Sequence, residues 1–231
     1  MKYVSCRKGF DDVNEFSPTG NQVYFGSLTP EPGELILVHG YNCQSRNIED
    51  AFRSNKEIAA ESGITNPVSG WLWPGLGANW LESLRFHKAQ DMADQASGYL
   101  ATYLNARPAT DALPSIMTHS LGARVALEAI LRNKVKVKTL ILLGAAVGAN
   151  ELTTKYISIK DSVGKILVFW SKRDPVLARA FQLDQLKTAL GHSGPTDKVP
   201  WVEDFDVSND VYQHGDYRFI RSIWEKTKEN L

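Results

Sequence analysis

Short apolar runs alternate along the chain with longer segments of helical periodicity. The apolar runs predict strands buried on both faces, and the segments between them predict helices. We expect strands at residues 35–38, 68–73, 114–118, 138–143, 165–170 and 199–207. We expect helices at residues 47–61, 80–105, 121–132, 151–163, 175–190 and 217–228. This alternation predicts an α/β fold, with a mostly parallel twisted sheet that helices cover on both faces.

The first 33 residues follow a different pattern. Short mixed segments are separated there by turn signals at residues 17–20 and 29–33, which contain Pro and Gly. We expect residues 1–33 to form an N-terminal arm or β-hairpin packed on a main domain at 34–231. Such an arm would also be the contact surface if the protein acted chiefly through a partner or a second copy. The sequence leaves the oligomeric state open.

The composition excludes several classes of protein. Of 231 residues, 43% are hydrophobic and 23% are charged, which is enough apolar sequence for a full core and excludes a disordered chain. The 26 Lys and Arg residues balance 26 Asp and Glu residues, so we expect no nucleic-acid partner. Cys6 and Cys43 have no metal-ligand spacing, and the sequence has no phosphate-binding or dinucleotide motif. We therefore expect neither a metal nor a cofactor.

The hydropathy of the chain does not indicate a membrane protein. The N-terminus lacks the apolar core of a secretory signal. The uncharged stretch at 139–150 is too short for a transmembrane helix, and the stretch at 64–81 contains prolines, asparagines and glycines. We expect a cytoplasmic protein without a transmembrane segment.

One strand end carries the pattern of a nucleophile. Thr118-His119-Ser120-Leu121-Gly122 lies between the strand at 114–118 and the helix at 121–132. In a G-x-S-x-G turn at this place, the tight strand-to-helix connection strains the serine backbone and exposes its hydroxyl. Thr118 stands here for the first glycine of that pattern, and Gly122 keeps the second. The position predicts Ser120 as a nucleophile.

A serine nucleophile needs a base and a carboxylate that holds the base. On open α/β sheets the site forms at the carboxyl ends of the strands, and the order along the chain is Ser, acid, His. Asp174 follows the strand at 165–170 and His214 follows the last strand. This order predicts a Ser120–Asp174–His214 triad.

Two alternatives to this triad stay open from the sequence. Asp206 ends the last strand and is an alternative acid, while His192 precedes that strand and is an alternative base. His119 is the neighbour of the nucleophile, and its side chain is expected on the other side of the strand, where it packs. His87 lies in a helical pattern, and we expect a structural role for it.

Backbone N–H groups would form the oxyanion hole. By position these are the N–H of Leu121, after the nucleophile, and the N–H of Tyr41, in the loop after the first buried strand. Gly40 lets this loop approach the substrate, and His39 is expected to bond to neighbouring loops. Trp71, Trp73 and Trp80 cluster near one strand end, and they are either core packing or an acyl-binding wall. Of the three, Trp73 is the substrate-binding candidate, together with Gly40.

The motifs together resemble the α/β-hydrolase superfamily, and within it a bacterial serine hydrolase family of unknown function. The resemblance covers roughly residues 33–225 and rests on residues 35–42, 71–74, 118–124, 169–174, 205–208 and His214. It implies the α/β-hydrolase fold and the same triad that the spacing predicts. The interval from Gly144 to Lys165 holds about one helix and a loop, so we expect no large cap domain and an open site.

The triad predicts a serine hydrolase, and we expect a carboxylic ester hydrolase that works through an acyl-enzyme on a small-molecule substrate. A thioesterase or an amidase would use the same residues. A binding module with a silent triad is the alternative outside enzymes. All three triad residues and Gly40 are present, which favours an enzyme.

Overall fold

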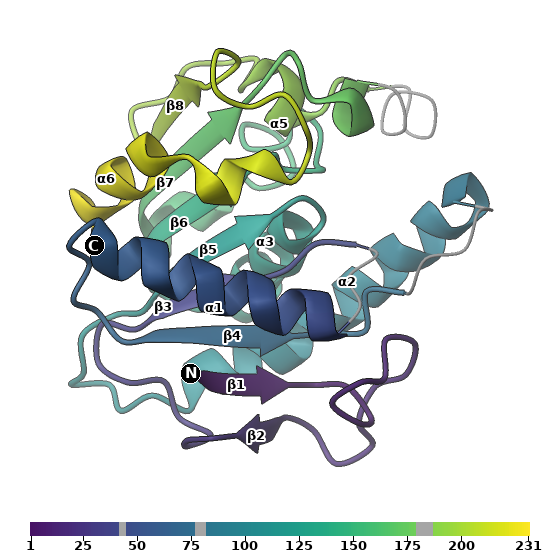
Figure 1. Ribbon diagram of the computed structural model, residues 1–231, viewed down its shortest axis with the longest axis vertical. Coiled ribbons are helices and arrows are strands. Elements are labelled where there is room, and N and C mark those ends of the chain that lie inside the picture. Colours follow the sequence, from purple (N-terminus) through teal and green to yellow (C-terminus); the bar gives the residue numbers. More distant parts are fainter. Residues whose placement is uncertain (42–44, 77–81, 179–186) are drawn as a thin grey trace.

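Eight strands form one sheet in the computed structural model, which describes residues 1–41, 45–76, 82–178 and 187–231. The strands are β1 (Lys2–Ser5), β2 (Gln22–Tyr24), β3 (Leu35–Val38), β4 (Val68–Leu72), β5 (Ser115–His119), β6 (Val137–Leu143), β7 (Val163–Trp170) and β8 (Val202–Asp206). They lie in the order β2-β1-β4-β3-β5-β6-β7-β8, and all paired neighbours are parallel except β1 and β2. The predicted mostly parallel sheet is confirmed, and the carboxyl ends of its parallel strands share one edge (Figure 1).

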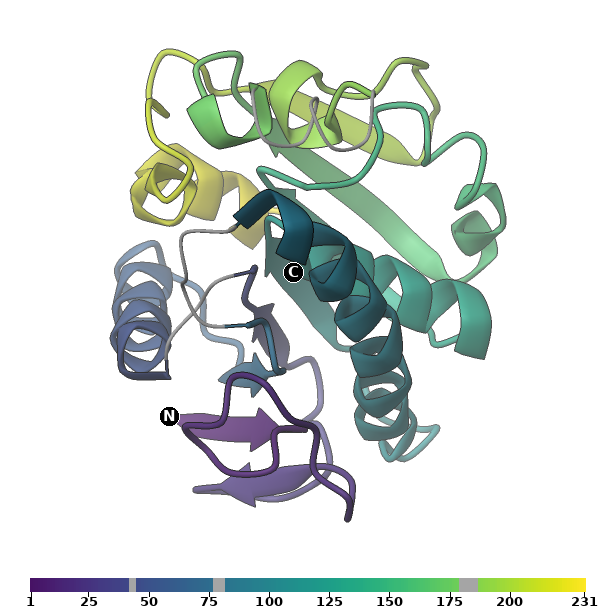
Figure 2. The same cartoon turned by 90° about the vertical axis from the view of Figure 1, so that its right-hand side faces the viewer.

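Helices cover both faces of the sheet (Figures 1 and 2). On one face lie α1 (Ser45–Glu61) and α6 (Arg221–Lys228), and on the other lie α2 (Glu82–Asn105) and α3 (Gly122–Asn133). The short helices are α5 (Leu190–Ser193) and the 3₁₀ helices η1 (Ile157–Asp161) and η3 (Asp216–Phe219). None of the helices in the described ranges is both long and apolar enough to cross a membrane.

The alternation of side chains along each strand explains why both faces are apolar. In β3, Ile36 and Val38 belong to the core under α2 and α3, while Leu35 and Leu37 belong to the core under α1 and α6. Successive strand side chains point to opposite faces, so a strand covered on both sides must be apolar at every position. All four residues of β3 are buried.

The first 33 residues contribute two strands at one edge of this sheet. β1 pairs in parallel with β4, with Tyr3 opposite Gly70, and pairs antiparallel with β2, with Val4 opposite Val23. The segment lies at the bottom of Figure 1, where the N-terminus is marked. The loop after β1 lies at the carboxyl edge of the sheet, where Arg7 donates a hydrogen bond to the backbone carbonyl of Trp73.

Three of the predicted helices differ from the observed ones. Residues 151–156 form turns and only Ile157–Asp161 form a 3₁₀ helix, a segment in which the branched Thr153, Thr154 and Ile157 disfavour a regular helix. In the predicted helix at 175–190, residues 175–178 are helical and 187–189 are not, while 179–186 lie outside the described residues. The closing helix is divided at Ile220, whose backbone is extended.

Between β6 and β7, residues 144–162 form turns, η1 and an isolated β-bridge from Gly148 to Ala189. A cap domain would need a long insertion at this place, and none is present in this interval. The predicted absence of a large cap is confirmed, and the residues that follow β6 are buried in the fold.

Candidate active site

Ser120 occupies a strained turn between β5 and α3. Its φ is 54°, in the left-handed region that costs a residue other than glycine about 1–3 kcal/mol. Backbone hydrogen bonds hold this conformation: Ser120 N–H donates to Leu143 O at 3.0 Å, and Ser120 O accepts from the N–H groups of Ala123 and Ala146, each at 3.1 Å. Strain that the surroundings hold in place at a strand end is typical of a nucleophile elbow.

The structure explains why the G-x-S-x-G pattern keeps its second glycine, Gly122, and tolerates Thr118 in place of the first. A Cβ at Gly122 would lie 2.5 Å from His39 O and 2.8 Å from Val38 O, so only glycine fits there. Thr118 takes the other glycine position without such a conflict. Its side chain is buried, and its hydroxyl donates to Ile141 O at 3.2 Å on the neighbouring strand.

His214 and Asp174 are joined by a short hydrogen bond. His214 Nδ1 donates to Asp174 Oδ2 over 2.7 Å, and the aspartate is fully buried while the His214 side chain is 17% exposed. The second oxygen, Asp174 Oδ1, accepts the N–H groups of Val176 and Leu177, each at 3.1 Å. The carboxylate is therefore fixed by the backbone and in turn fixes the orientation of the imidazole.

The protonation of Asp174 follows from these partners. Burial on its own would raise the pKa of this carboxyl, but the hydrogen bond and charge of His214, with the N–H groups of Leu177 and Val176, hold the pKa below its ordinary value. The hydroxyl of Tyr217 donates toward Asp174 Oδ2 at 3.3 Å and toward Gly191 O at 3.1 Å. Asp174 is thus ionised at neutral pH and holds the Nδ1–H tautomer of His214.

His119 ties the catalytic loops together. Its Nε2 lies 2.6 Å from His214 O, and the two rings are 4.6 Å apart. Because a carbonyl can only accept, Nε2 carries the proton. Burial, then the neighbouring His214 and Arg218, lower the pKa of His119 to about 3, so it is neutral. The neighbour of the nucleophile thus supports the loop of the predicted base, a contact that strand alternation alone did not predict.

The structure brings His214 next to the residue that precedes Ser120. Ser120 Oγ and His214 make no hydrogen bond with each other in the described structure, and such bonds are often longer in free enzymes than in substrate complexes. The alternative residues lie elsewhere. Asp206 Oδ1 accepts from the N–H and hydroxyl of Ser208, and His192 lies on α5.

His39 lies behind the predicted oxyanion loop with both ring nitrogens bonded. Nδ1 donates to Gly40 O at 2.7 Å, and Nε2 accepts from Trp73 N–H at 3.1 Å and lies 3.3 Å from Arg7 Nη2. Burial first, and then the charge of Arg7, lower the pKa of His39 well below its usual value. The ring is therefore a neutral, fixed tautomer that turns the Gly40 carbonyl toward itself.

This orientation fixes the next peptide group. Because a trans peptide places C=O and N–H on opposite sides, the Tyr41 N–H points away from His39. A Cβ at Gly40 would lie 2.8 Å from Ser120 Cβ, so the loop packs directly against the nucleophile. The other predicted donor, Leu121 N–H, is at the first turn of α3, where N–H groups have no partner within the helix.

The tryptophans support the loops from inside the fold. Trp73 is fully buried, stacks on the His39 ring at 5.5 Å and 9°, and donates from Nε1 to His39 O at 2.9 Å. It has no exposed surface to offer a substrate, so its position is that of a loop support and not of the substrate wall that the sequence suggested. Trp71 is also fully buried, and Trp80 lies outside the described residues.

The sequence analysis did not identify Arg7 and Tyr217 as residues of the site. Arg7 is fully buried and donates from Nε to Trp73 O at 2.9 Å and from Nη1 to Phe10 O at 3.2 Å. Tyr217 follows His214 by three residues, at the start of a segment predicted to be a helix.

Cys6 is buried as a free thiol, and Cys43 lies outside the described residues. In the described ranges, no cluster of three His, Cys, Asp or Glu side chains could hold a metal ion.

Comparison with known proteins gives one family. Residues 28–204 match the model of a family described as "Alpha/beta hydrolase of unknown function (DUF900)". The matched part contains Ser120 and Asp174 and ends before His214. A search of curated proteins gives no match.

Solved structures of hydrolases are similar at low identity. A predicted CIB-like hydrolase from Thermoplasma acidophilum has 19% identity and a TM-score of 0.49, over 90% of this chain and 89% of that one. The type II thioesterase YbtT has 15% identity and a TM-score of 0.47, over 88% and 96%. An α/β serine hydrolase without lid from Xanthomonas campestris has 14% identity and a TM-score of 0.43, over 87% and 81%.

Proposed function

This chain belongs to the DUF900 family of α/β hydrolases, and we propose that it is a serine hydrolase that cleaves carboxylic esters of small molecules through an acyl-enzyme. The observation that carries the proposal is the 2.7 Å bond from His214 Nδ1 to the buried Asp174, with His214 in contact with His119, the residue before a serine held at φ 54°. A buried carboxylate that fixes a histidine next to a strained serine is an arrangement suited to nucleophilic catalysis.

The mechanism follows from the tautomer of His214. Since Nδ1–H is bonded to Asp174, Nε2 is the basic nitrogen and takes the hydroxyl proton of Ser120 as its oxygen attacks the ester carbonyl. The N–H groups of Tyr41 and Leu121 stabilise the oxyanion that forms. His214 then returns the proton to the departing alcohol. Water, activated by the same nitrogen, hydrolyses the acyl-enzyme and releases the acid and the free serine.

The geometry near the nucleophile supports an open site. The interval between β6 and β7 is too short for a large cap, and Gly40 leaves no side chain between its loop and Ser120. A thioester would be attacked by the same groups. A panel of matched oxygen esters, thioesters and amides ranks these substrates by kcat/KM, with the ester expected to be the best.

A fluorophosphonate probe tests the nucleophile without knowledge of the substrate. We expect intact-mass analysis to show one adduct on the wild-type protein and none on Ser120→Ala. Absence of the adduct on folded wild-type protein would contradict the proposal and favour a binding module. An adduct that persists in Ser120→Ala would place the nucleophile at another residue.

A further inference from the structure

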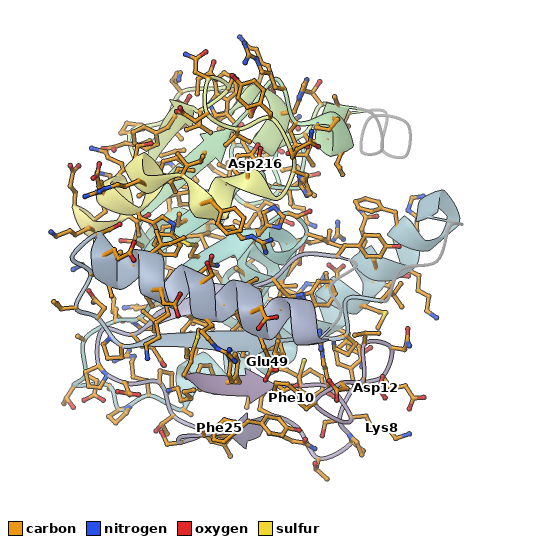
Figure 3. The ribbon with its side chains drawn as sticks, viewed as in Figure 1. Lys8, Phe10, Asp12, Phe25, Glu49 and Asp216 are labelled. Atoms are coloured by element: carbon orange, nitrogen blue, oxygen red, sulfur yellow. The ribbon has the colours of Figure 1, made fainter. Side chains whose placement is uncertain are left out.

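A cavity of about 230 Å³ lies beside the predicted catalytic loops, on the face of the sheet that α1 covers. Its walls come from β3, β5, α1 and the η3 segment. The η3–α6 segment and α1 cover the same face of the sheet, and Figures 1 and 2 show them side by side. Figure 3 labels Glu49 on α1 and Asp216 at the start of η3. Most of the lining is apolar, with Ile48, Phe52 and Met117 among the residues that form it.

Two polar side chains in this cavity have buried atoms without a hydrogen bond. Arg218 Nε is buried and has no hydrogen-bond partner, while the guanidinium lies over the Phe219 ring with Cζ 4.8 Å from the ring centroid. Oδ1 of Asn55, a residue that is 8% exposed, also has no hydrogen-bond partner. Natural proteins rarely leave such groups unsatisfied, and a ligand is one explanation where they face a cavity. Both side chains line the same cavity, from α1 and from η3.

The cavity carries a positive charge. Among the described residues of the lining, Arg218 carries the charge and none is Asp or Glu. His119, which also lines it, is neutral because burial and then the nearby His214 and Arg218 lower its pKa to about 3. A guanidinium on an apolar wall favours a planar anion, to which it can donate two parallel hydrogen bonds.

The cavity adjoins the nucleophile. Gly40 and His119 line it, and a Cβ at Gly40 would lie 2.8 Å from Ser120 Cβ. His119 immediately precedes Ser120 along the chain. A ligand in the cavity would therefore lie against the two loops that carry the predicted nucleophile and oxyanion donors.

We propose that this cavity binds a carboxylate at the far end of the acyl group, so that the substrates of this site are mono-esters of short dicarboxylic acids. Arg218 would bind both carboxylate oxygens, and the amide of Asn55, turned about its last side-chain bond, would donate to one of them. Phe52, Ile48 and Met117 would contact the methylene chain. The inference rests on the proposed ester hydrolysis at Ser120.

A matched pair of substrates tests the carboxylate. In 4-nitrophenyl hydrogen adipate a carboxylate occupies the place of the terminal methyl group of 4-nitrophenyl hexanoate. We expect wild-type kcat/KM to be at least about 10-fold higher for the adipate. Arg218→Met should lower the adipate-to-hexanoate ratio about 10- to 100-fold, Arg218→Lys less, and Asn55→Asp should lower it through repulsion.

Arg221→Met is the matched control, because Arg221 lies three residues further on, is 77% exposed and pairs with Glu225. We expect it to keep the wild-type ratio. A wild-type preference for the hexanoate, or a ratio that Arg218→Met leaves unchanged, would overturn the proposal while esterase activity stands. A preference for a phosphate-terminated ester of the same length, lost in Arg218→Met, would overturn the choice of carboxylate.

Failure of the proposed function has a different result. If neither ester is cleaved and the fluorophosphonate does not label Ser120, calorimetric titration with adipate tests the cavity directly. Binding by the wild-type protein that Arg218→Met abolishes would support a carboxylate site on a protein that is not an esterase. Absence of binding would overturn the cavity proposal together with the function.

Discussion

At the scale of single residues, the choice of the acid depends on which carboxylate the imidazole meets. Asp174 and Asp206 both lie at a strand end between Ser120 and His214, so chain order does not distinguish them, and only the family resemblance favours Asp174. The structure joins His214 to Asp174, whereas Asp206 is exposed and accepts hydrogen bonds from Ser208. The spacing of residues could not assign the acid, because the assignment depends on which of the two carboxylates the fold brings to His214.

Substitution of the two aspartates checks this choice. Asp174→Asn removes the charge that holds the Nδ1–H tautomer, and we expect kcat to fall by about 10³- to 10⁴-fold. Asp206→Asn is the matched control, with an expected change below about 3-fold. Steady-state kinetics on an aryl ester measures both, and a larger loss in Asp206→Asn would assign the acid to Asp206.

Arg7 is a buried cation that the sequence does not reveal, because its partners are distant in the chain. It bonds to the carbonyls of Trp73 and Phe10 and contacts His39. Figure 3 labels Phe10 and, next to it in this loop, the exposed Lys8. Two adjacent cationic residues thus differ in environment, because Arg7 is buried and Lys8 is exposed.

We expect Arg7→Met to lower the free energy of unfolding by about 2–4 kcal/mol, because it leaves buried carbonyl groups without donors. Lys8→Met removes only an exposed ion pair with Glu15, which is typically worth about 0–1 kcal/mol. Urea unfolding of the two variants measures the difference. Equal destabilisation by both substitutions would show that the buried network does not stabilise the fold.

At the scale of elements, the apolar runs predicted the central strands because a strand covered on both faces is apolar at every position. β1 and β2 lie at the edge of the sheet, where an arm or a β-hairpin was expected, because their short mixed sequences lack a continuous apolar run. The segment at 151–163 shows the opposite error. Its apolar spacing fits a helix, but its branched residues form turns and η1.

The connection from β5 to α3 could be predicted in detail, because a tight turn allows few residue types. We expect Gly122→Ala to abolish most activity and to destabilise the fold, since its Cβ would lie 2.5 Å from His39 O. Gly98→Ala in α2 is the control, as a Cβ there meets nothing within 4 Å and alanine favours the helix by about 0.5–1 kcal/mol. Thermal unfolding and fluorophosphonate labelling compare the two variants. Full labelling of Gly122→Ala would contradict the close approach of the loops.

At the scale of the whole molecule, two neutral histidines, the buried His39 and the half-buried His119, make stability depend on pH. His39 and His119 both have a pKa lowered by burial, the latter to about 3, and both lie at the carboxyl edge of the sheet. The native protein does not bind these protons as the pH falls below about 6.5, while the unfolded chain does. Proton binding therefore stabilises the unfolded state relative to the native state, and the free energy of unfolding falls as the pH falls through that range.

The expected slope follows from the number of protons taken up on unfolding. Between about pH 6 and pH 4.5, each of the two histidines should lower the free energy of unfolding by about 1.4 kcal/mol per pH unit. His119→Gln keeps a donor for His214 O and removes one titrating group, so its slope should be about half as steep. Asp174 adds its loss only at lower pH, because its pKa is held below the ordinary value. Urea unfolding at several pH values measures the slopes. Identical slopes for the wild-type protein and His119→Gln would show that His119 is protonated in the native state, and the tie between the nucleophile and His214 would then lack its neutral donor.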